Sequence, residues 1–293
     1  MKYFVHSDYY SSYVSGPLYG DLDKNGKITP WNLLFHIQIE ATGAYSDATS
    51  KPQAYPAFYY PVSRSGSTII DTATRFCQID ILPAYHQQPH CNLTIQKDLW
   101  FSYLGNTSYC MDMTVRNALT DETLVRAVRH QVRINHKSRQ PAKLPNKWFQ
   151  QIRRDQLTRS KPPQGFMQPS RPDANYLFNV TVTSSCVDSN QHQNMAIHLK
   201  NCWDAGSAAA CSNQLSQFNT DLAYYNLKQV SFLYQREVFN GDILQVACWE
   251  HPNKSNTLCF TMNKGSKVIG QCQMEFYPKS QSMPVQADTK AKL

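Results

Sequence analysis

The sequence has no apolar run long enough to cross a bilayer, although 41% of its 293 residues are hydrophobic. Its opening segment, MKYFVHSDYYSS, lacks the apolar core of a secretory signal peptide. The nine cysteines are an odd number, no two form a C-x-x-C pair, and their spacings match neither a zinc site nor a disulfide framework. These absences predict an intracellular protein with no membrane span, free thiols in a reducing compartment, and no metal site or cofactor.

Acidic residues are nearly absent from one stretch of the chain. Residues 124–171 contain twelve of the 29 Lys and Arg residues and one acid, Asp155. Such a stretch suits a polyanionic partner, such as the phosphates of coenzyme A, an acidic carrier protein or nucleic acid. A solvated strand face followed by a basic linker explains the same composition equally well. No nucleic-acid-binding motif accompanies the charge, so nucleic acid is the least favoured partner.

One phrase is written twice in the chain: Asp, then Asn two places later, a basic or imidazole side chain after four, and a helix-capping residue after six. The copies are Asp23, Asn25, Lys27 and Thr29, and Asp188, Asn190, His192 and Asn194. A chain of this length can form two domains, and the repetition favours two. The expected division is a first domain at 1–139, a basic linker at 140–172, a second domain at 173–278 and a flexible tail at 279–293.

The second domain is expected to contain a strand, a helix and an antiparallel meander in that order. Residues 176–185 alternate as a strand, and a mostly apolar helix capped by Asn194 follows from Met195 to about Ala210. Asn240-Gly241 predicts a type I′ hairpin between the first two of the later strands. Those strand-like runs are 227–238, 242–250, 256–262 and 267–277.

The first domain is expected to repeat this order with additions. Thr29-Pro30 is a strong helix start, and the helix is expected to run to about Asp47. Strand-like runs follow at 91–103, 107–116 and 123–136. The first domain also has about 30 more residues than the second between matching motifs, which predicts a lid or packing insertion near 49–85. The linker is expected to be partly helical from Trp148 to Leu157.

A long apolar helix cradled by an antiparallel sheet is the pattern of the hotdog fold. The sequence predicts this pattern twice, so the expected class is α+β with a tandem (double) hotdog architecture. The two copies would pair as a hotdog dimer does, with the pseudo-twofold axis inside one chain. Each repeated phrase then marks the start of one central helix.

The start of such a helix suits thioester chemistry. Its unpaired amides, here those near Asn194, Met195 and Ala196, can stabilise the oxyanion that develops on an attacked carbonyl. Asp188 can serve as nucleophile or as general base on a water, and His192 can protonate the leaving thiolate. Each residue type also has a common structural explanation, as a helix cap, a turn residue or a surface histidine.

The second copy of the phrase resembles the Asp-x-Asn-Gln-His-Val-Asn-Asn signature of plant and bacterial acyl-ACP thioesterases. Further on, LYQREVFNGDILQ (233–245) is similar to the Glu-Tyr-Arg-Arg-Glu-Cys strand of that family, which places Glu237 on the family's catalytic Glu. The neighbouring family Cys falls on Val238, so no thiol acts there. The resemblance implies a fatty acyl thioesterase. Its catalytic residues would be Asp188, Asn190, His192 and Glu237.

The segment Tyr19-Gly20-Asp21-Leu22-Asp23 resembles hydroxybenzoyl-CoA thioesterases, whose catalytic carboxylate is the second Asp of Gly-Asp-x-Asp. Asp23 is therefore a further catalytic candidate. The first copy departs from the pattern because Lys27 stands where His is expected, and aligning the hairpins puts Ser102 opposite Glu237. The second domain is thus expected to supply most of the chemistry and the first mainly the acyl pocket. The expected substrate-binding residues are Asn25, Thr29, Asn194 and Met195.

The end of the sequence, Ala291-Lys292-Leu293, is a variant of the peroxisomal Ser-Lys-Leu address. It predicts a peroxisomal import receptor as partner and the peroxisomal matrix as location, with the cytoplasm as the alternative. A peroxisomal location favours acyl-CoA over acyl-ACP as substrate.

Two other functions remain open. A hotdog enoyl-CoA hydratase carries Gly-Asp-x-Asn-Pro-x-His, but here the His comes one residue early and the Gly and Pro are missing. The chain is alternatively a non-catalytic protein that binds acyl thioesters, because a fold does not guarantee its chemistry. Release of free thiol from acyl-CoA separates the thioesterase from both.

Overall fold

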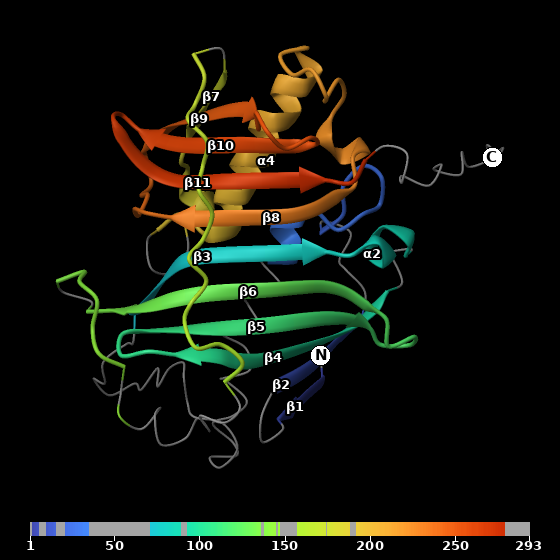
Figure 1. The fold of residues 1–293 in the computed structure, drawn as a ribbon, viewed down its shortest axis with the longest axis vertical. Helices are drawn as coiled ribbons and strands as arrows, with labels where there is room; N and C mark the ends of the chain where they lie inside the picture. The colour runs from blue at the N-terminus through green and yellow to red at the C-terminus, as the bar shows by residue number, and fades with distance from the viewer. Residues whose placement is uncertain are drawn as a thin grey trace.

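The computed structural model describes residues 2–5, 10–15, 21–34, 71–88, 93–135, 138–144, 146, 157–173, 175–187 and 192–278. Within them, eleven strands form one antiparallel sheet in the order β1-β2-β4-β5-β6-β3-β8-β11-β10-β9-β7 (Figure 1). The strands are β1 (Lys2–Val5), β2 (Tyr10–Ser15), β3 (Asp71–Ile81), β4 (Thr94–Leu104), β5 (Ser108–Asn117), β6 (Thr123–Ile134), β7 (Tyr176–Thr181), β8 (Leu227–Tyr234), β9 (Ile243–Glu250), β10 (Thr257–Lys264) and β11 (Lys267–Phe276).

Helices are few in the described part of the chain. Residues 30–34 begin one helix, and the others are α2 (Pro83–Gln87), α4 (Met195–Cys211) and the short 3-10 helices η5 (Ser184–Cys186) and η6 (Leu222–Tyr224). None of the helices found there is long and apolar enough to span a membrane.

The strand order repeats across the sheet. The N-terminal half, which contains β1 to β6 and α2, has the order β2-β4-β5-β6-β3, and the C-terminal half, β7 to β11 with α4, has the order β7-β9-β10-β11-β8. Counted from β2 and from β7, each half places its first strand beside its third and its second strand beside its fifth. The halves meet where β3 pairs with β8, from Phe76 opposite Leu233 to Asp80 opposite Gln229.

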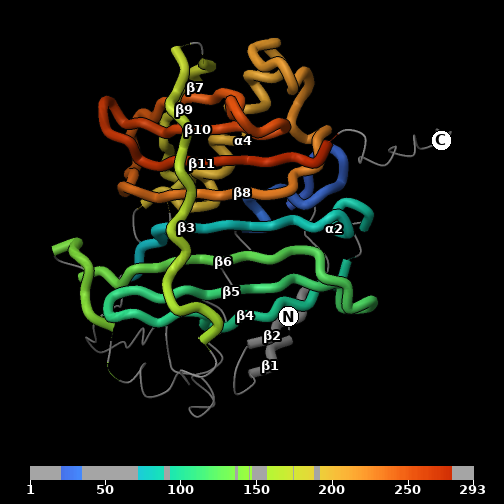
Figure 2. The backbone as a smooth tube through the Cα atoms, in the orientation of Figure 1, coloured from blue at the N-terminus to red at the C-terminus, as the bar shows by residue number. Residues whose placement is uncertain are grey.

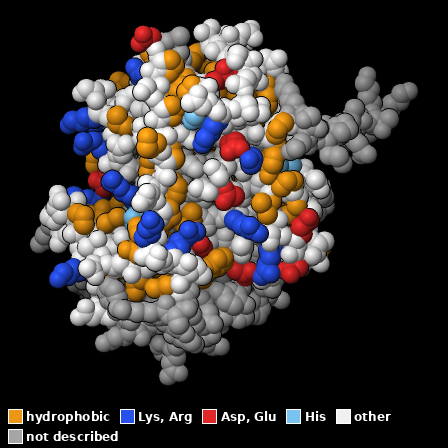
Figure 3. Space-filling model, in the orientation of Figure 1, with side chains coloured by type: hydrophobic (Ala, Val, Ile, Leu, Met, Phe, Trp, Pro, Cys, Tyr) orange, Lys and Arg blue, Asp and Glu red, His pale blue; other side chains and the backbone are white. Residues whose placement is uncertain are grey.

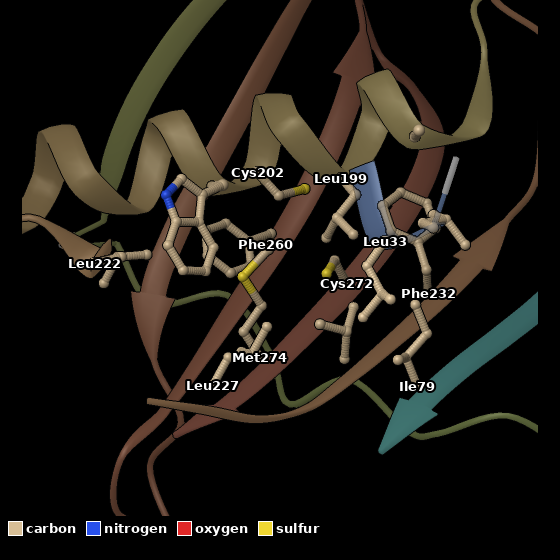
Figure 4. Packing of buried hydrophobic residues seen from close by; sticks show 14 of the residues in the cluster. Leu33, Ile79, Leu199, Cys202, Leu222, Leu227, Phe232, Phe260, Cys272 and Met274 are labelled. Carbon is tan, nitrogen blue, oxygen red and sulfur yellow. The ribbon is translucent and has the colours of Figure 1, made fainter. Parts of the chain in front are cut away.

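The long helix α4 covers one face of the sheet and starts as its sequence predicts. The Asn194 backbone is extended, and its side-chain oxygen accepts a hydrogen bond from Ala196 N at 2.8 Å, which caps the helix. Leu199 and Cys202 of α4 lie in one apolar cluster with Phe260 of β10 and Cys272 of β11 (Figure 4). Fully burying side chains of the size of Leu or Phe contributes roughly 1.5–3 kcal/mol each. This apolar contact therefore fixes α4, and with it the position of its first turn.

The linker crosses the opposite face of the sheet. In Figures 1 and 2, residues 157–173 run over strands of both halves, on the side away from α4. Arg159 N donates to the carbonyl of Ser102 on β4 at 2.8 Å, and Gln168 Nε2 donates to the carbonyl of Phe260 on β10 at 3.1 Å. The linker thus ties the two halves together. All but the last residue of the helix expected from Trp148 to Leu157 lies outside the described residues.

Several expected elements are confirmed, including the cap and start of α4, β4 to β6 and β9 to β11. The hairpin expected at Asn240-Gly241 is wrong. Strand β8 lies between β3 and β11, whereas β9 lies between β10 and β7, so the connection crosses over. Of the two turn residues, only Gly241 has a positive φ, at 85°, whereas a type I′ turn needs both. Both edges of β8 are occupied, one by β3 of the other half and one by β11.

The expected insertion near 49–85 also needs correction. Residues 71–81 of that stretch form β3, the central strand that joins the halves, and Pro83–Gln87 form α2. Residues 51–70 lie outside the described part of the chain. The match of Ser102 with Glu237 falls with this correction. Ser102 lies within β4, which corresponds in sheet order to β9, whereas Glu237 follows β8, the counterpart of β3.

Candidate active site

The chain approaches α4 along the segment that follows β8. Gln193 N donates to the carbonyl of Val238 at 2.8 Å, and Asn194 N donates to the carbonyl of Cys186 at 3.0 Å. These bonds hold the residues before the helix against the segment after β8 and against Cys186 of η5. Asp188 and Asn190, two of the expected catalytic residues, lie outside the described residues.

Two of the expected catalytic side chains meet at this point. His192 Nε2 lies 3.5 Å from Glu237 Oε2, and the two side chains are 23% and 35% exposed. The ring of Phe239 packs edge-on against the imidazole, with ring centroids 5.1 Å apart. A carboxylate beside an imidazole can fix the orientation of the ring, which is an arrangement that general acid–base chemistry uses.

Arg139, which the sequence did not single out, completes this group from the other half of the molecule. Its guanidinium donates to Glu237 Oε1, so one carboxylate oxygen faces Arg139 and the other faces His192. Arg139 and Glu237 are 98 residues apart in the sequence. The only signal in the sequence was the basic composition of residues 124–171, which does not point to one position.

The amides of the first helical turn are mostly occupied. Asn194 N donates to Cys186, and Ala196 N donates to the Asn194 side chain. Met195 N has no acceptor among the described residues. Of the three amides expected to hold a carbonyl oxygen, the Met195 amide is therefore the one left to do so.

The floor beneath this amide is aromatic and uncharged. Tyr234 OH donates to the carbonyl of Met195 at 3.3 Å, and its ring stacks on Phe232 with centroids 4.2 Å apart. His198 packs against both rings, and burial lowers the pKa of His198 to about 4. Burial also raises the pKa of Tyr234. Both groups are therefore neutral at pH 7, and the carboxylate and guanidinium of the site are those of Glu237 and Arg139.

The first copy of the phrase forms a closed turn. Asp23 Oδ1 accepts hydrogen bonds from Asn25 N at 2.8 Å and Lys27 N at 3.0 Å. Gly26 has a positive φ of 72°, which the turn requires and glycine tolerates without strain. The Thr29 side chain is buried and accepts from Asn32 N at 3.4 Å, so it caps the helix that starts at residue 30. The contacts of Asp23 and Thr29 described above are thus those of turn and cap residues.

This turn docks at the far end of α4. Lys24 Nζ pairs with Asp221 Oδ2 at 2.9 Å, and Asn25 Nδ2 donates to the carbonyl of Ala223 at 2.9 Å. Lys27 Nζ donates to Asn226 Oδ1 at 2.8 Å, and burial lowers the pKa of Lys27, an effect that nearby Asp23 opposes. The structure therefore does not bring Asp23 and Asn25 together with His192.

The separation follows from the length of the helix. Asp221 Oδ1 lies 3.3 Å from the hydroxyl of Ser207, twelve residues along α4 from Met195. At 1.5 Å per residue, the two phrases mark points roughly 18 Å apart along the helix axis.

Some of the basic residues of 124–171 are already paired or buried. Arg159 forms an ion pair with Asp112 at 2.8 Å, and Arg129 is only 8% exposed and donates to Gln131. On the face displayed in Figure 3, Lys and Arg side chains lie among Asp and Glu side chains instead of forming one continuous basic surface. Within the described residues, no group of three or more His, Cys, Asp or Glu side chains is placed to hold a metal ion.

Comparison with solved structures identifies the fold. A 12:0-ACP thioesterase from Umbellularia californica matches 94% of this chain and 100% of its own, with a TM-score of 0.70 and 14% identity. An acyl-ACP thioesterase from Bacteroides thetaiotaomicron matches 92% of this chain and 98% of its own, with a TM-score of 0.66 and 16% identity.

No protein-family model matches the sequence, and neither does any curated protein. At these identities the structural likeness establishes architecture and not activity. Together with the single antiparallel sheet and the buried helix α4, it shows that this chain has a hotdog-type fold of the kind found in acyl-ACP thioesterases.

Proposed function

We propose that the protein is a thioesterase that hydrolyses fatty acyl thioesters to a free fatty acid and a thiol, on two hotdog units arranged in tandem. The observation that carries the proposal is the His192–Glu237 pair at the start of α4. The repeated strand order supports the tandem arrangement, with β3 and β8 as the strands that join the units. The likeness to acyl-ACP thioesterases over nearly the whole chain supports the activity.

The reaction needs a bound carbonyl, an attacking water and a proton for the leaving group. The thioester carbonyl oxygen accepts a hydrogen bond from Met195 N, at the positive end of the α4 dipole. Asp188 takes a proton from a water, whose oxygen forms a bond to the carbonyl carbon, and Asn190 orients that water. His192 protonates the thiolate as the carbon–sulfur bond breaks. In this scheme Glu237 fixes the His192 ring, because both of its carboxylate oxygens are already engaged.

The N-terminal half has a different role in this proposal. The contacts of Asp23, Asn25 and Thr29 are structural, so we assign no chemistry to that turn. Alternate residues of β5 are buried toward the core, including Met113 and Val115. Such a surface suits an apolar acyl chain, so this half provides the acyl pocket.

The carrier and the location follow from less direct arguments. The two similar solved structures are named as acyl-ACP enzymes, whereas the Ala291-Lys292-Leu293 address favours a peroxisomal location and acyl-CoA. We propose acyl-CoA as the main substrate, with acyl-ACP as the alternative. Residues 279–293 lie outside the described residues, so the address is tested by imaging a fluorescent fusion with and without Leu293.

The test of the activity is thiol release from matched acyl-CoA and acyl-ACP series. Wild-type protein is expected to release thiol, and Glu237→Gln to lower kcat by about 10- to 100-fold through loss of His192 alignment. Glu275→Gln is the matched control, because Glu275 pairs with Lys228 on β8, away from the start of α4. Hydration of enoyl-CoA without thiol release would favour the hydratase, and saturable binding without turnover would favour a carrier protein.

A further inference from the structure

The two halves meet at the carboxylate of Glu237. This residue follows β8 in the C-terminal half, whereas Arg139 lies in the loop after β6 in the N-terminal half. Glu237 Oε1 accepts a hydrogen bond from Arg139 and Oε2 lies 3.5 Å from His192 Nε2. The carboxylate therefore sits between a guanidinium and an imidazole, with one oxygen directed at each.

The backbone around Arg139 is held by several local contacts. Arg139 has a positive φ of 55°, a region that non-glycine residues adopt rarely and at some cost in energy. Its amide donates to the carbonyl of Asn135 at 2.8 Å, and the Asn135 side chain accepts from Ser138 N at 3.0 Å. Ile134 and Pro141 close the base of the loop through an isolated bridge. These contacts fix the backbone at Arg139.

The partner residue is fixed as firmly. The amides of Gln235 and Arg236 both donate to the carbonyl of Ile269 on β11, at 2.9 Å and 3.1 Å. On the other side of Glu237, the carbonyl of Val238 accepts from Gln193 N, next to His192. A displacement of Glu237 would therefore also displace Gln193 and His192, the residues before α4.

We propose that Arg139 is a positioning residue contributed by the N-terminal half to the catalytic centre of the C-terminal half. Its guanidinium holds Glu237 so that the second carboxylate oxygen faces His192. The inference rests on the proposed thioesterase activity for its kinetic consequence, but not for its geometry. An ion pair whose side chains are both 35% exposed contributes little to folding. The contact thus has its main effect on alignment, which is sensitive to displacements of about 1 Å.

The kinetic test compares Arg139→Gln with Arg139→Lys and Arg126→Gln. Arg126 is exposed on β6, the strand that precedes the loop of Arg139, so its substitution removes the same charge without touching Glu237. We expect Arg139→Gln to lower kcat for acyl-CoA hydrolysis by about 10- to 100-fold with KM and thermal midpoint unchanged. Lysine keeps the charge but not the forked geometry, so Arg139→Lys should recover part of the loss. A change in KM alone, or equal effects of Arg139→Gln and Arg126→Gln, would overturn the inference.

The geometric test does not depend on turnover. The imidazole NMR signals of His192, assigned by their loss in His192→Ala, should move in Arg139→Gln and stay in place in Arg126→Gln. Signals that do not move in Arg139→Gln would overturn the positioning role, whatever the activity. If the signals move while the wild-type protein releases no thiol, the positioning contact is supported and the thioesterase proposal fails.

Discussion

The two copies of the Asp-Asn phrase have similar sequences but different surroundings. In the N-terminal half, Asp23 accepts hydrogen bonds from two backbone amides, and the turn contacts the segment after α4 through the ion pair of Lys24 with Asp221. In the C-terminal half, His192 faces a carboxylate that Arg139 also contacts. The chemical difference between the copies lies in the basic residue, which is His192 in one and Lys27 in the other. An imidazole can exchange a proton near neutral pH, whereas the ammonium group of Lys27 donates a hydrogen bond to Asn226. In the proposed function, one copy of the phrase belongs to the catalytic centre and the other forms a structural turn.

The largest expected effect separates the basic positions of the two copies. His192→Ala should lower kcat for acyl-CoA hydrolysis by about 10²–10⁴-fold, because it removes the proton donor to the leaving thiolate. Lys27→Ala should leave kcat unchanged, since Lys27 contacts Asn226 at the far end of α4. Steady-state kinetics of both variants on one acyl-CoA provide the measurement. A large kcat loss in Lys27→Ala would contradict the assigned division of roles.

The next effect concerns stability against pH and arises in α4. The pKa of His198 is lowered to about 4 by burial, so between the ordinary value of about 6.5 and pH 4 the unfolded chain binds a proton that the folded protein does not. Stability therefore falls as the pH falls through this range, by up to about 3 kcal/mol at pH 4. Urea unfolding at pH 7 and pH 4 should show a smaller difference in His198→Gln than in wild type. An equal pH dependence in both proteins would show that His198 is not held neutral.

A smaller effect is expected at the turn of the N-terminal half. Asp23→Ala removes the acceptor of two backbone amides and should cost about 1–2 kcal/mol of unfolding free energy. Asp23→Asn keeps an acceptor oxygen and should cost less, and both variants should retain the wild-type kcat. Chemical denaturation and thiol release on the same samples measure the two properties. Loss of kcat in a fully folded Asp23→Asn protein would restore Asp23 as a catalytic residue.

The smallest effect is expected for the exposed ion pair between Lys24 and Asp221. Lys24 and Asp221 are 48% and 33% exposed, so solvent screens the pair and its coupling in a double-mutant cycle should be small. Hydrogen bonding to Asp221 raises the pKa of Lys24. Burial raises the pKa of Asp221, but hydrogen bonds from Ala223 N and Lys24 outweigh this effect, so the pKa of Asp221 is lowered overall. A cycle of Lys24→Met and Asp221→Asn in 0.05 M and 1 M salt should show coupling that disappears at high salt. Coupling that persists would show that the pair is better shielded than its exposure indicates.

The sequence predicted the elements whose signals are local. Asn194 before an apolar run fixed the start of α4 to the residue, because capping depends on neighbours two or three positions away. Strand β3 was not predicted, although Cys77, Ile79 and Ile81 alternate as buried residues, because it follows a Pro- and Ser-rich stretch that indicated an insertion. The Asn240-Gly241 pair predicted a hairpin wrongly because β8 pairs with β3 of the other half, a contact that no local pattern indicates.

The site was predictable only in part for the same reason. The phrase and the strand motif singled out His192 and Glu237 separately, and the structure places Nε2 of one 3.5 Å from Oε2 of the other, whereas their shared catalytic role stays a prediction. Nothing local marks Arg139 among the twelve basic residues of 124–171, since its partner is 98 positions away. The Ala196 amide, expected to be free for a carbonyl, is taken by the Asn194 cap, a competition that the sequence does not reveal.

The most direct measurement is free thiol release from one acyl-CoA by two isosteric variants, Asp188→Asn and Asp23→Asn, beside the wild type. Each removes a single negative charge from the same place in one copy of the phrase. We expect Asp188→Asn to lose nearly all thiol release and Asp23→Asn to keep it. Retained release in a folded Asp188→Asn protein, together with its loss in Asp23→Asn, would instead place the chemistry in the N-terminal half.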